Sequence, residues 1–196
     1  MLSLHLRDLN ADIVAAWREA FADLGNVEVS QGDILELEAD AIVSPANSFG
    51  DMDGGIDLAY ARHFGYEIEG RLQEQINQHH HGELPVGQAL VLATQHKAIP
   101  YMVSAPTMRV PSSIPRTVNV YLAMRAALIA VQAHNKKSVR TIESLLVPGL
   151  GTGIGEMPPA RAARQMRIAF DAILGGRAPG RRNVGAIWNE HGDMLA

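Results

Sequence analysis

The chain has 196 residues and no cysteine, and its 21 acidic residues outnumber its 17 lysines and arginines, so the formal net charge is −4 at pH 7. A hydrophobic fraction of 47% with 19% charged residues is typical of a globular protein and argues against intrinsic disorder. The missing cysteines exclude a disulfide framework, a thiolate nucleophile and a metal site with cysteine ligands. The net negative charge gives no strong nucleic-acid signal.

The length predicts a single domain over residues 1–196, because it only slightly exceeds the usual size of about 150 residues per domain. Residues 1–8 lack the positively charged start and long apolar segment of an export signal. No stretch contains the roughly 18 consecutive apolar residues that a membrane span requires. We therefore expect a soluble, cytoplasmic protein with no membrane partner.

Hydrophobic periodicity predicts strands and helices that alternate along the chain. Alternating residues or short apolar runs predict strands at residues 2–7, 27–30, 41–44, 89–93, 101–105, 145–147 and 184–188. Apolar residues at helical spacing predict helices at residues 13–24, 56–64, 66–79, 115–134 and 158–174. This alternation implies a sheet covered by helices on both faces, whose ligands bind beyond the carboxyl ends of the strands.

A glycine-rich turn over residues 44–57 leads from a predicted strand into a predicted helix. Gly54 and Gly55 lack a Cβ atom, so the backbone can take unusual conformations and a ligand can approach closely. The start of the following helix offers unpaired N–H groups and partial positive charge to an anion. The alternative is a plain turn whose amides meet water.

A second glycine-rich turn, over residues 148–159, joins the predicted strand 145–147 to the last long helix. Every second residue over 149–155 is a glycine, so successive amides can point into one anion-binding concavity. No Lys-Ser or Lys-Thr pair closes the turn, which excludes a P-loop, and the spacing departs from the Rossmann fingerprint. Two such turns could clamp a diphosphate, since backbone amides supply positive potential even in a net-acidic protein.

Four short motifs, in this order, resemble the signature of the macro domain family. They are Gln-Gly-Asp-Ile at residues 31–34, Asp-Ala-Ile-Val-Ser-Pro-Ala-Asn at 40–47, Gly-Gly-Ile-Asp at 54–57 and Gly-Thr-Gly-Ile-Gly at 151–155. The resemblance spans roughly residues 27–190. It implies a three-layer α/β/α sandwich with a central mixed, mostly parallel sheet and a cleft for ADP-ribose.

The resemblance also assigns residues to the adenine end of that cleft. Asp33 would accept a hydrogen bond from the adenine amino group, and Ile34 would contribute its backbone. Trp188, at the end of the last predicted strand, would lie against the adenine ring. Each side chain has a plainer alternative, which is a turn aspartate that bonds local amides for Asp33 and a buried core residue for Trp188.

Asn47 and Asp57 are the candidate catalytic residues that the resemblance implies. Asn47 would orient the distal ribose, and Asp57, in the first turn of a helix, would orient or polarise a water. The alternatives are a turn asparagine and an acid that only stabilises its helix. The other ligand-binding residues implied at the diphosphate and distal ribose are Gly54, Gly55, Ile56, Gly151, Thr152, Gly153, Ile154 and Gly155.

The chain departs from the family pattern in three places. Asp51 and Asp53 stand where many members have glycines, and they would repel a diphosphate unless they turn outward. Ser44 replaces the first residue of the common Asn-Ala-Ala-Asn. The second loop continues as Gly-Glu-Met at residues 155–157, where many members keep an aromatic residue beside the distal ribose. The two aspartates bear on the affinity for a diphosphate, whereas the missing aromatic residue weakens the case for hydrolysis more than the case for binding.

The leading hypothesis is a macro domain that binds ADP-ribose or an ADP-ribosylated substrate. A hydrolytic version would act as a mono-ADP-ribosyl hydrolase, an O-acetyl-ADP-ribose deacetylase or an ADP-ribose-1″-phosphatase. The alternative is a non-enzymatic reader or an assembly protein that retains the fold. A third, weaker hypothesis is a nicotinamide-dependent dehydrogenase, which rests only on Gly-Leu-Gly at residues 149–151.

No cofactor and no metal are expected. Three adjacent histidines, His79, His80 and His81, lie at a predicted helix end, where consecutive side chains point in different directions. A basic surface loop is expected at Arg177, Arg181 and Arg182, which could meet an acidic partner or only aid solubility. The sequence leaves the oligomeric state open.

Overall fold

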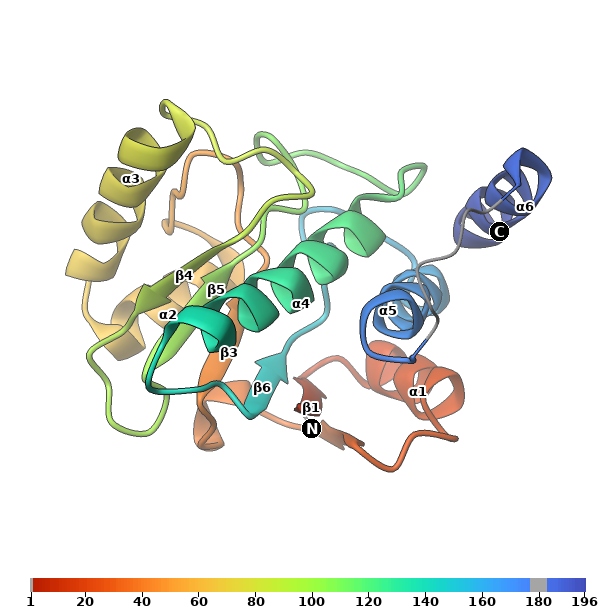
Figure 1. Ribbon diagram of the computed structural model, residues 1–196, viewed down its shortest axis with the longest axis horizontal. Coiled ribbons are helices and arrows are strands. Elements are labelled where there is room, and N and C mark those ends of the chain that lie inside the picture. The colour runs from red at the N-terminus through yellow and green to blue at the C-terminus, as the bar shows by residue number, and fades with distance from the viewer. Residues whose placement is uncertain (1, 177–182) are drawn as a thin grey trace.

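The computed structural model describes residues 2–176 and 183–196 (Figure 1). The predicted basic loop at Arg177, Arg181 and Arg182 lies outside the described residues. A six-stranded sheet runs through the centre of the molecule in the order β2-β1-β6-β3-β5-β4. Its strands are β1 (Ser3–Asp8), β2 (Val27–Gln31), β3 (Ala41–Ser44), β4 (Leu90–Ala93), β5 (Tyr101–Ser104) and β6 (Ser144–Val147).

The sheet is mixed and mostly parallel. Neighbouring strands run parallel from β2 through β1, β6 and β3 to β5, and only the edge strand β4 pairs antiparallel, with β5. Parallel pairs need long crossover connections, and helices supply most of them here. These helices are α1 (Ala11–Ala20), α2 (Gly55–Phe64), α3 (Glu67–His80), α4 (Asn119–Lys137) and α5 (Pro159–Ile173), followed by α6 (Val184–Leu195).

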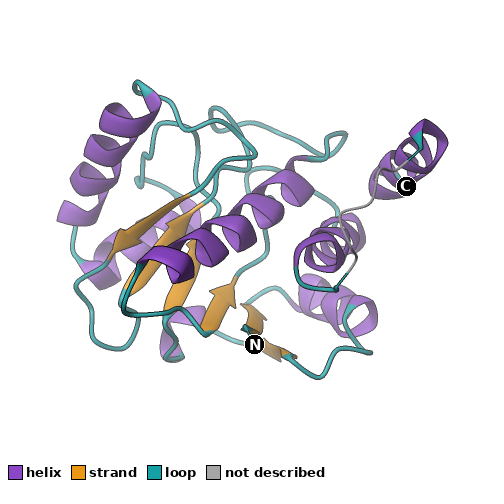
Figure 2. Cartoon of the chain, in the orientation of Figure 1, coloured by secondary structure: helices purple, strands orange, loops and turns teal. Residues whose placement is uncertain are grey.

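Helices cover both faces of the sheet, as the alternation of strands and helices predicts (Figure 2). On the central strand β6, the buried side chains of Leu145 and Val147 belong to a core with α1, α4 and α5, while Leu146 between them belongs to a second core with α2 and α3. Successive side chains of a strand point to opposite faces, so a continuous apolar run is what a doubly covered strand needs. The fold is the expected three-layer α/β/α sandwich.

Asp40, just before β3, ties the starts of two neighbouring strands together. One of its carboxylate oxygens accepts hydrogen bonds from the backbone N–H groups of Glu143 and Ser144 and from the Ser144 hydroxyl, at 2.9–3.0 Å. Burial alone would raise the pKa of Asp40, but these hydrogen bonds together outweigh it and hold the pKa below its ordinary 3.8. Asp40 therefore stabilises the fold as an ionised carboxylate.

The strand predicted at residues 184–188 is wrong, because the structure has the helix α6 there. Asn183 caps this helix by accepting a hydrogen bond from the N–H of Ala186 at 2.8 Å. A short apolar run fits a strand and a helix equally well, and the cap with the helical residues beyond Trp188 decides for the helix. The helix is anchored to α5, where the Gln165 side chain donates to the carbonyl of Met194 at 3.0 Å.

The other predicted strands and helices are confirmed, with ends that shift by a few residues. The largest shifts are of four residues, at α1, which ends at Ala20 and not at residue 24, and at α4, which begins at Asn119 and not at residue 115. In the described part of the chain, no helix has the length and apolar character needed to cross a bilayer.

Candidate functional site

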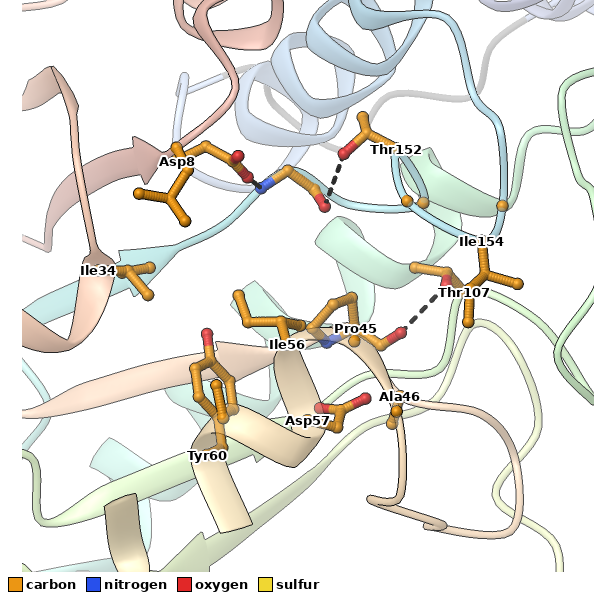
Figure 3. Close-up of a pocket in the computed structure, with 18 of the residues that line it drawn as sticks. Asp8, Ile34, Pro45, Ala46, Ile56, Asp57, Tyr60, Thr107, Thr152 and Ile154 are labelled. Carbon is orange, nitrogen blue, oxygen red and sulfur yellow. Dashed lines mark hydrogen bonds between the residues drawn. The ribbon is translucent and has the colours of Figure 1, made fainter. Parts of the chain in front are cut away.

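A cleft of about 490 Å³ opens at the carboxyl ends of the parallel strands, and both glycine-rich loops line it (Figure 3). The first loop follows β3 and contributes Gly54 and Gly55, and the second follows β6 and contributes Gly151, Gly153 and Gly155. A volume of this size suits a small-molecule ligand. The two loops, which are about 100 residues apart in sequence, therefore meet around one open space.

The second glycine loop is folded tightly on itself. The N–H of Met157 donates to the carbonyl of Gly151 at 2.9 Å, and the carbonyl of Gly155 accepts from the N–H of Ile114 at 2.8 Å. A Cβ atom at residue 155 would lie 2.4 Å from the carbonyl oxygen of Gly151, and Gly151 itself has φ of 68°. Both positions therefore require glycine, one for space and one for its backbone conformation.

The backbone amides of the two loops are available to a ligand. Within the described residues, the N–H groups of residues 151–155 have no hydrogen-bond acceptor, and Gly54 begins α2 without a side-chain cap. The first N–H groups of a helix have no partner inside it, so the start of α2 presents further free donors beside the cleft. Free donors on two sides of one cleft make a site for an anion with several oxygens.

Asp57 lies in the first turn of α2 and lines the cleft, with only 9% of its surface exposed. One carboxylate oxygen accepts a hydrogen bond of 2.6 Å from the buried hydroxyl of Ser44 at the end of β3. The other carboxylate oxygen has no hydrogen-bond donor among the described residues. Burial raises the pKa of Asp57 from 3.8 to about 6, although the Ser44 hydrogen bond opposes the rise.

The pKa of Asp57 suits a group that takes up a proton near neutral pH. A carboxylate with a pKa close to the working pH is a better general base than an ordinary surface aspartate. Ser44 thus fixes one oxygen of Asp57 and leaves the other for a ligand or a water.

Asn47 lines the cleft as expected and is 8% exposed, and its amide is bound within its own loop. Its side-chain oxygen accepts from the N–H of Phe49 at 2.9 Å, and its side-chain nitrogen donates to the carbonyl of Asp51 at 3.2 Å. These are the bonds of a turn asparagine. Asn47 therefore shapes the first loop, and its contact with a distal ribose stays a prediction.

Asp33 and Ile34 line the opposite end of the cleft. Asp33 caps a short 3-10 helix, η1 (Ile34–Glu36), where one carboxylate oxygen accepts from the N–H of Leu35 at 2.9 Å. Ile34 is buried beside it. In Figure 3, Ile34 lies with Asp8 on one side of the cleft and Asp57 lies on the other. The adenine role of Asp33 stays a prediction, with its second carboxylate oxygen left for it.

Trp188 does not line the cleft, so the expected contact with adenine is wrong. It lies on α6, not on a strand of the sheet, and 69% of its surface is exposed. The expectation depended on a final strand whose carboxyl end would have joined the others at the cleft. The described residues 184–188 do not form that strand, and Trp188 instead lies outside the cleft on α6, which packs on α5.

Replacing Trp188 with alanine is expected to leave ligand affinity unchanged to within about twofold, because exposed side chains away from a site contribute little. The measurement is calorimetric titration with ADP-ribose, and the melting temperature checks that the variant is folded. A tenfold loss of affinity would show that α6 contributes to the site after all.

Several cleft residues escape the sequence interpretation. They include Arg7, Asp8 and Asn10 at the end of β1 and Tyr60 on α2. Thr107 and Met108, from the proline-bounded loop after β5, also line the cleft. Asp8 accepts a hydrogen bond of 2.9 Å from the N–H of Gly149, so it ties the β1 end to the second glycine loop. Its position directly after the predicted strand 2–7 was the signal that could have identified it.

Comparison with known proteins agrees with this architecture. The Macro domain family model matches residues 43–166. A protein of unassigned function from Aquifex aeolicus is 35% identical over 141 residues, which are 72% of this chain and 78% of that protein. A second one, from Aeropyrum pernix, is 34% identical over 77% of this chain and 73% of its own length.

Solved structures of the same fold are similar in shape. The Oceanobacillus iheyensis macrodomain with ADPR, as a mutant, superposes with a TM-score of 0.62 at 22% identity, over 76% of this chain and 78% of that one. The macrodomain of Mycobacterium tuberculosis DarG gives a TM-score of 0.61 at 22% identity, over 73% of this chain and 88% of that one. The family match, the relatives and the fold agree, and the chain belongs to the macro domain family.

Proposed function

We propose that this protein binds ADP-ribose, free or attached to a substrate, in the cleft between the two glycine loops. The observation that carries the proposal is the presence of free backbone amides on two sides of one cleft, because a diphosphate offers acceptor oxygens on both sides. Structures of the Oceanobacillus iheyensis macrodomain with ADPR and with ADP support the same ligand class.

In this arrangement, the adenine would lie toward Asp33 and Ile34 and the distal ribose toward Asn47 and Asp57. The expectation is supported by Figure 3, in which Ile34 and Asp57 lie on different sides of the cleft. The amides would hold the diphosphate without any lysine.

Titration with ADP-ribose tests the binding. We expect saturable heat, weaker binding of AMP and still weaker binding of ribose 5-phosphate, because each fragment loses contacts at one end of the cleft. NADH is titrated in the same way, because saturable binding of NADH would favour the dehydrogenase hypothesis. If ADP-ribose at millimolar concentration produces neither heat nor a thermal shift, the proposal fails.

We further propose that the site hydrolyses an ADP-ribosyl linkage, with Asp57 as the base. A water oxygen would attack the anomeric carbon of the distal ribose, the bond from that carbon to the acceptor would break, and Asp57 would take the proton from the water. The unbonded oxygen of Asp57 and its pKa of about 6 support this role.

Release of ADP-ribose from a mono-ADP-ribosylated protein tests the hydrolysis. Asp57→Asn keeps the shape of the side chain and removes its basicity, so the rate is expected to fall by at least about 100-fold. Equal rates for the variant and the wild type would exclude Asp57 as the base.

The second candidate function is a reader that binds ADP-ribose without cleaving it. One observation favours it. The second loop continues into Glu156 and Met157, so it has no aromatic ring beside the expected place of the distal ribose. Glu156 is exposed and has φ of 53°, and Met157 is buried. Binding without turnover of ester-linked and phosphorylated substrates would select the reader.

A further inference from the structure

The side chains of the cleft carry negative charge, although its amides suit an anion. Five aspartates line it, namely Asp8, Asp33, Asp51, Asp53 and Asp57, against one arginine, Arg7. The Arg7 guanidinium is already engaged, because it donates to Glu36 at 2.7 Å, to the carbonyl of Asp33 at 2.8 Å and to the Ser30 hydroxyl at 3.1 Å. No free cationic side chain is therefore left on the cleft among the described residues.

Three of these aspartates belong to the first glycine loop and the start of α2. Asp51 and Asp53 are exposed, so we call this part of the cleft its mouth, while Asp57 is buried. The loop is held in place, because the Asn47 side chain bonds the backbone of Asp51 at 3.2 Å. The backbone that carries the Asp51 carboxylate is therefore anchored within the loop.

A nearby arginine does not cancel this charge. Arg109 stacks over the ring of Phe49 at 5.1 Å in the same region, but its guanidinium forms two hydrogen bonds with Glu83, at 2.8 and 3.0 Å. A bidentate pair of this kind is neutral as a whole. The Asp51 carboxylate accepts a hydrogen bond of 3.4 Å from the neutral side chain of Gln73 on α3. Among the described residues, neither Asp51 nor Asp53 therefore has a cationic partner on the cleft lining.

A bound metal ion is not the counter-charge that this arrangement favours. In residues 2–176 and 183–196, no group of three or more histidine or acidic side chains is close enough to hold one. Separated, exposed carboxylates instead suit several mobile cationic side chains. An anionic group placed beyond the distal ribose would be repelled, and repulsion is a common basis of specificity.

We propose that this cleft selects ADP-ribose carried on a basic peptide, with Asp51 and Asp53 contacting lysine or arginine side chains next to the modified residue. The same carboxylates discriminate against derivatives that carry a phosphate on the distal ribose. This inference rests on the proposed binding of ADP-ribose and adds the chemistry of the group attached to it.

The experiment compares three ligands by calorimetry: free ADP-ribose, and two peptides with the same ADP-ribosyl linkage that are flanked by lysines or by glutamates. At low ionic strength, the lysine-flanked peptide is expected to bind about tenfold more tightly than the glutamate-flanked one, because exposed charges each contribute a few tenths to one kcal/mol. The preference should shrink as salt is added, since salt screens exposed charges.

The double variant Asp51→Asn, Asp53→Asn is expected to reduce the preference to less than about threefold while affinity for free ADP-ribose stays equal or rises. The matched control is Glu38→Gln, Glu74→Gln, which changes the net charge equally at exposed residues outside the cleft and should keep the full preference. Equal affinity of the wild type for both peptides would overturn the inference. If none of the three ligands binds, it is the proposed function that fails.

Discussion

Replacing Gly155 with alanine is expected to lower affinity for ADP-ribose about 100-fold without unfolding the protein. The new Cβ atom would lie 2.4 Å from the carbonyl oxygen of Gly151 and 3.0 Å from a side-chain carbon of Ile114, so the loop backbone must move. The free amides of residues 151–155 would then be displaced from their present positions beside the cleft. A hydrogen bond to a charged group contributes about 1.5–3 kcal/mol, and the loss of one or two of them accounts for the expected change.

The measurement is titration with ADP-ribose, together with circular dichroism and the melting temperature. Overpacking costs about 1–3 kcal/mol of stability, so the variant should melt at a lower temperature and still be folded at 25 °C. Gly25→Ala is the control, because a Cβ atom at that residue meets nothing within 4 Å and Gly25 lies outside the cleft. Unchanged affinity in a folded Gly155→Ala variant would mean that the second loop does not hold the phosphates.

The sequence predicts the fold well because the sheet is buried on both faces. An apolar run such as residues 145–147 is ambiguous by itself, but several such runs followed by glycine turns and helices indicate a covered parallel sheet. The two glycine loops could be predicted to meet for the same reason, since the ends of parallel strands share one edge of the sheet. The cleft of the structure confirms that step.

The side-chain bonds of the site could not be predicted, because they depend on contacts across the chain. The turn bonds of Asn47 are local, but the engagement of Arg7 joins residues 7, 33 and 36. Nothing in the sequence shows that Ser44 bonds Asp57, since residue 44 ends a strand and residue 57 begins a helix. Trp188 shows the opposite problem, in which a local apolar pattern fits two structures and only the packing of α6 selects one.

Ionised Asp57 lowers the stability of the folded protein at neutral pH. Its pKa rises from 3.8 to about 6 on folding because of burial, and each pKa unit corresponds to about 1.4 kcal/mol. The folded protein therefore binds the proton more tightly than the unfolded chain, and stability from this group is greatest at low pH and falls as pH rises between 4 and 6. At pH 7, ionised Asp57 destabilises the fold by about 3 kcal/mol. Functional residues commonly have perturbed pKa values and lower the stability of the fold, and Asp57 in this cleft has both properties.

The variant Asp57→Asn is therefore expected to be more stable than the wild type by about 2–3 kcal/mol at pH 7, and by less than about 1 kcal/mol at pH 4. The neutral amide avoids the burial of a charge, and its oxygen can still accept the hydrogen bond from Ser44. Urea denaturation at pH 4, 5.5 and 7 measures the difference.

Asp40→Asn is a control because its effect on stability at neutral pH is expected to be opposite to that of Asp57→Asn. The pKa of Asp40 is lowered in the folded protein, so its contribution to stability is present above pH 4 and is lost as pH falls. This variant should be less stable than the wild type at neutral pH, because it weakens the bonds to Glu143 and Ser144. Equal stability of Asp57→Asn and the wild type at pH 7 would show that Asp57 is well solvated. If Asp57→Asn is instead more stable and has lost hydrolysis while it still binds ADP-ribose, the loss comes neither from unfolding nor from lost binding and must come from the missing carboxylate.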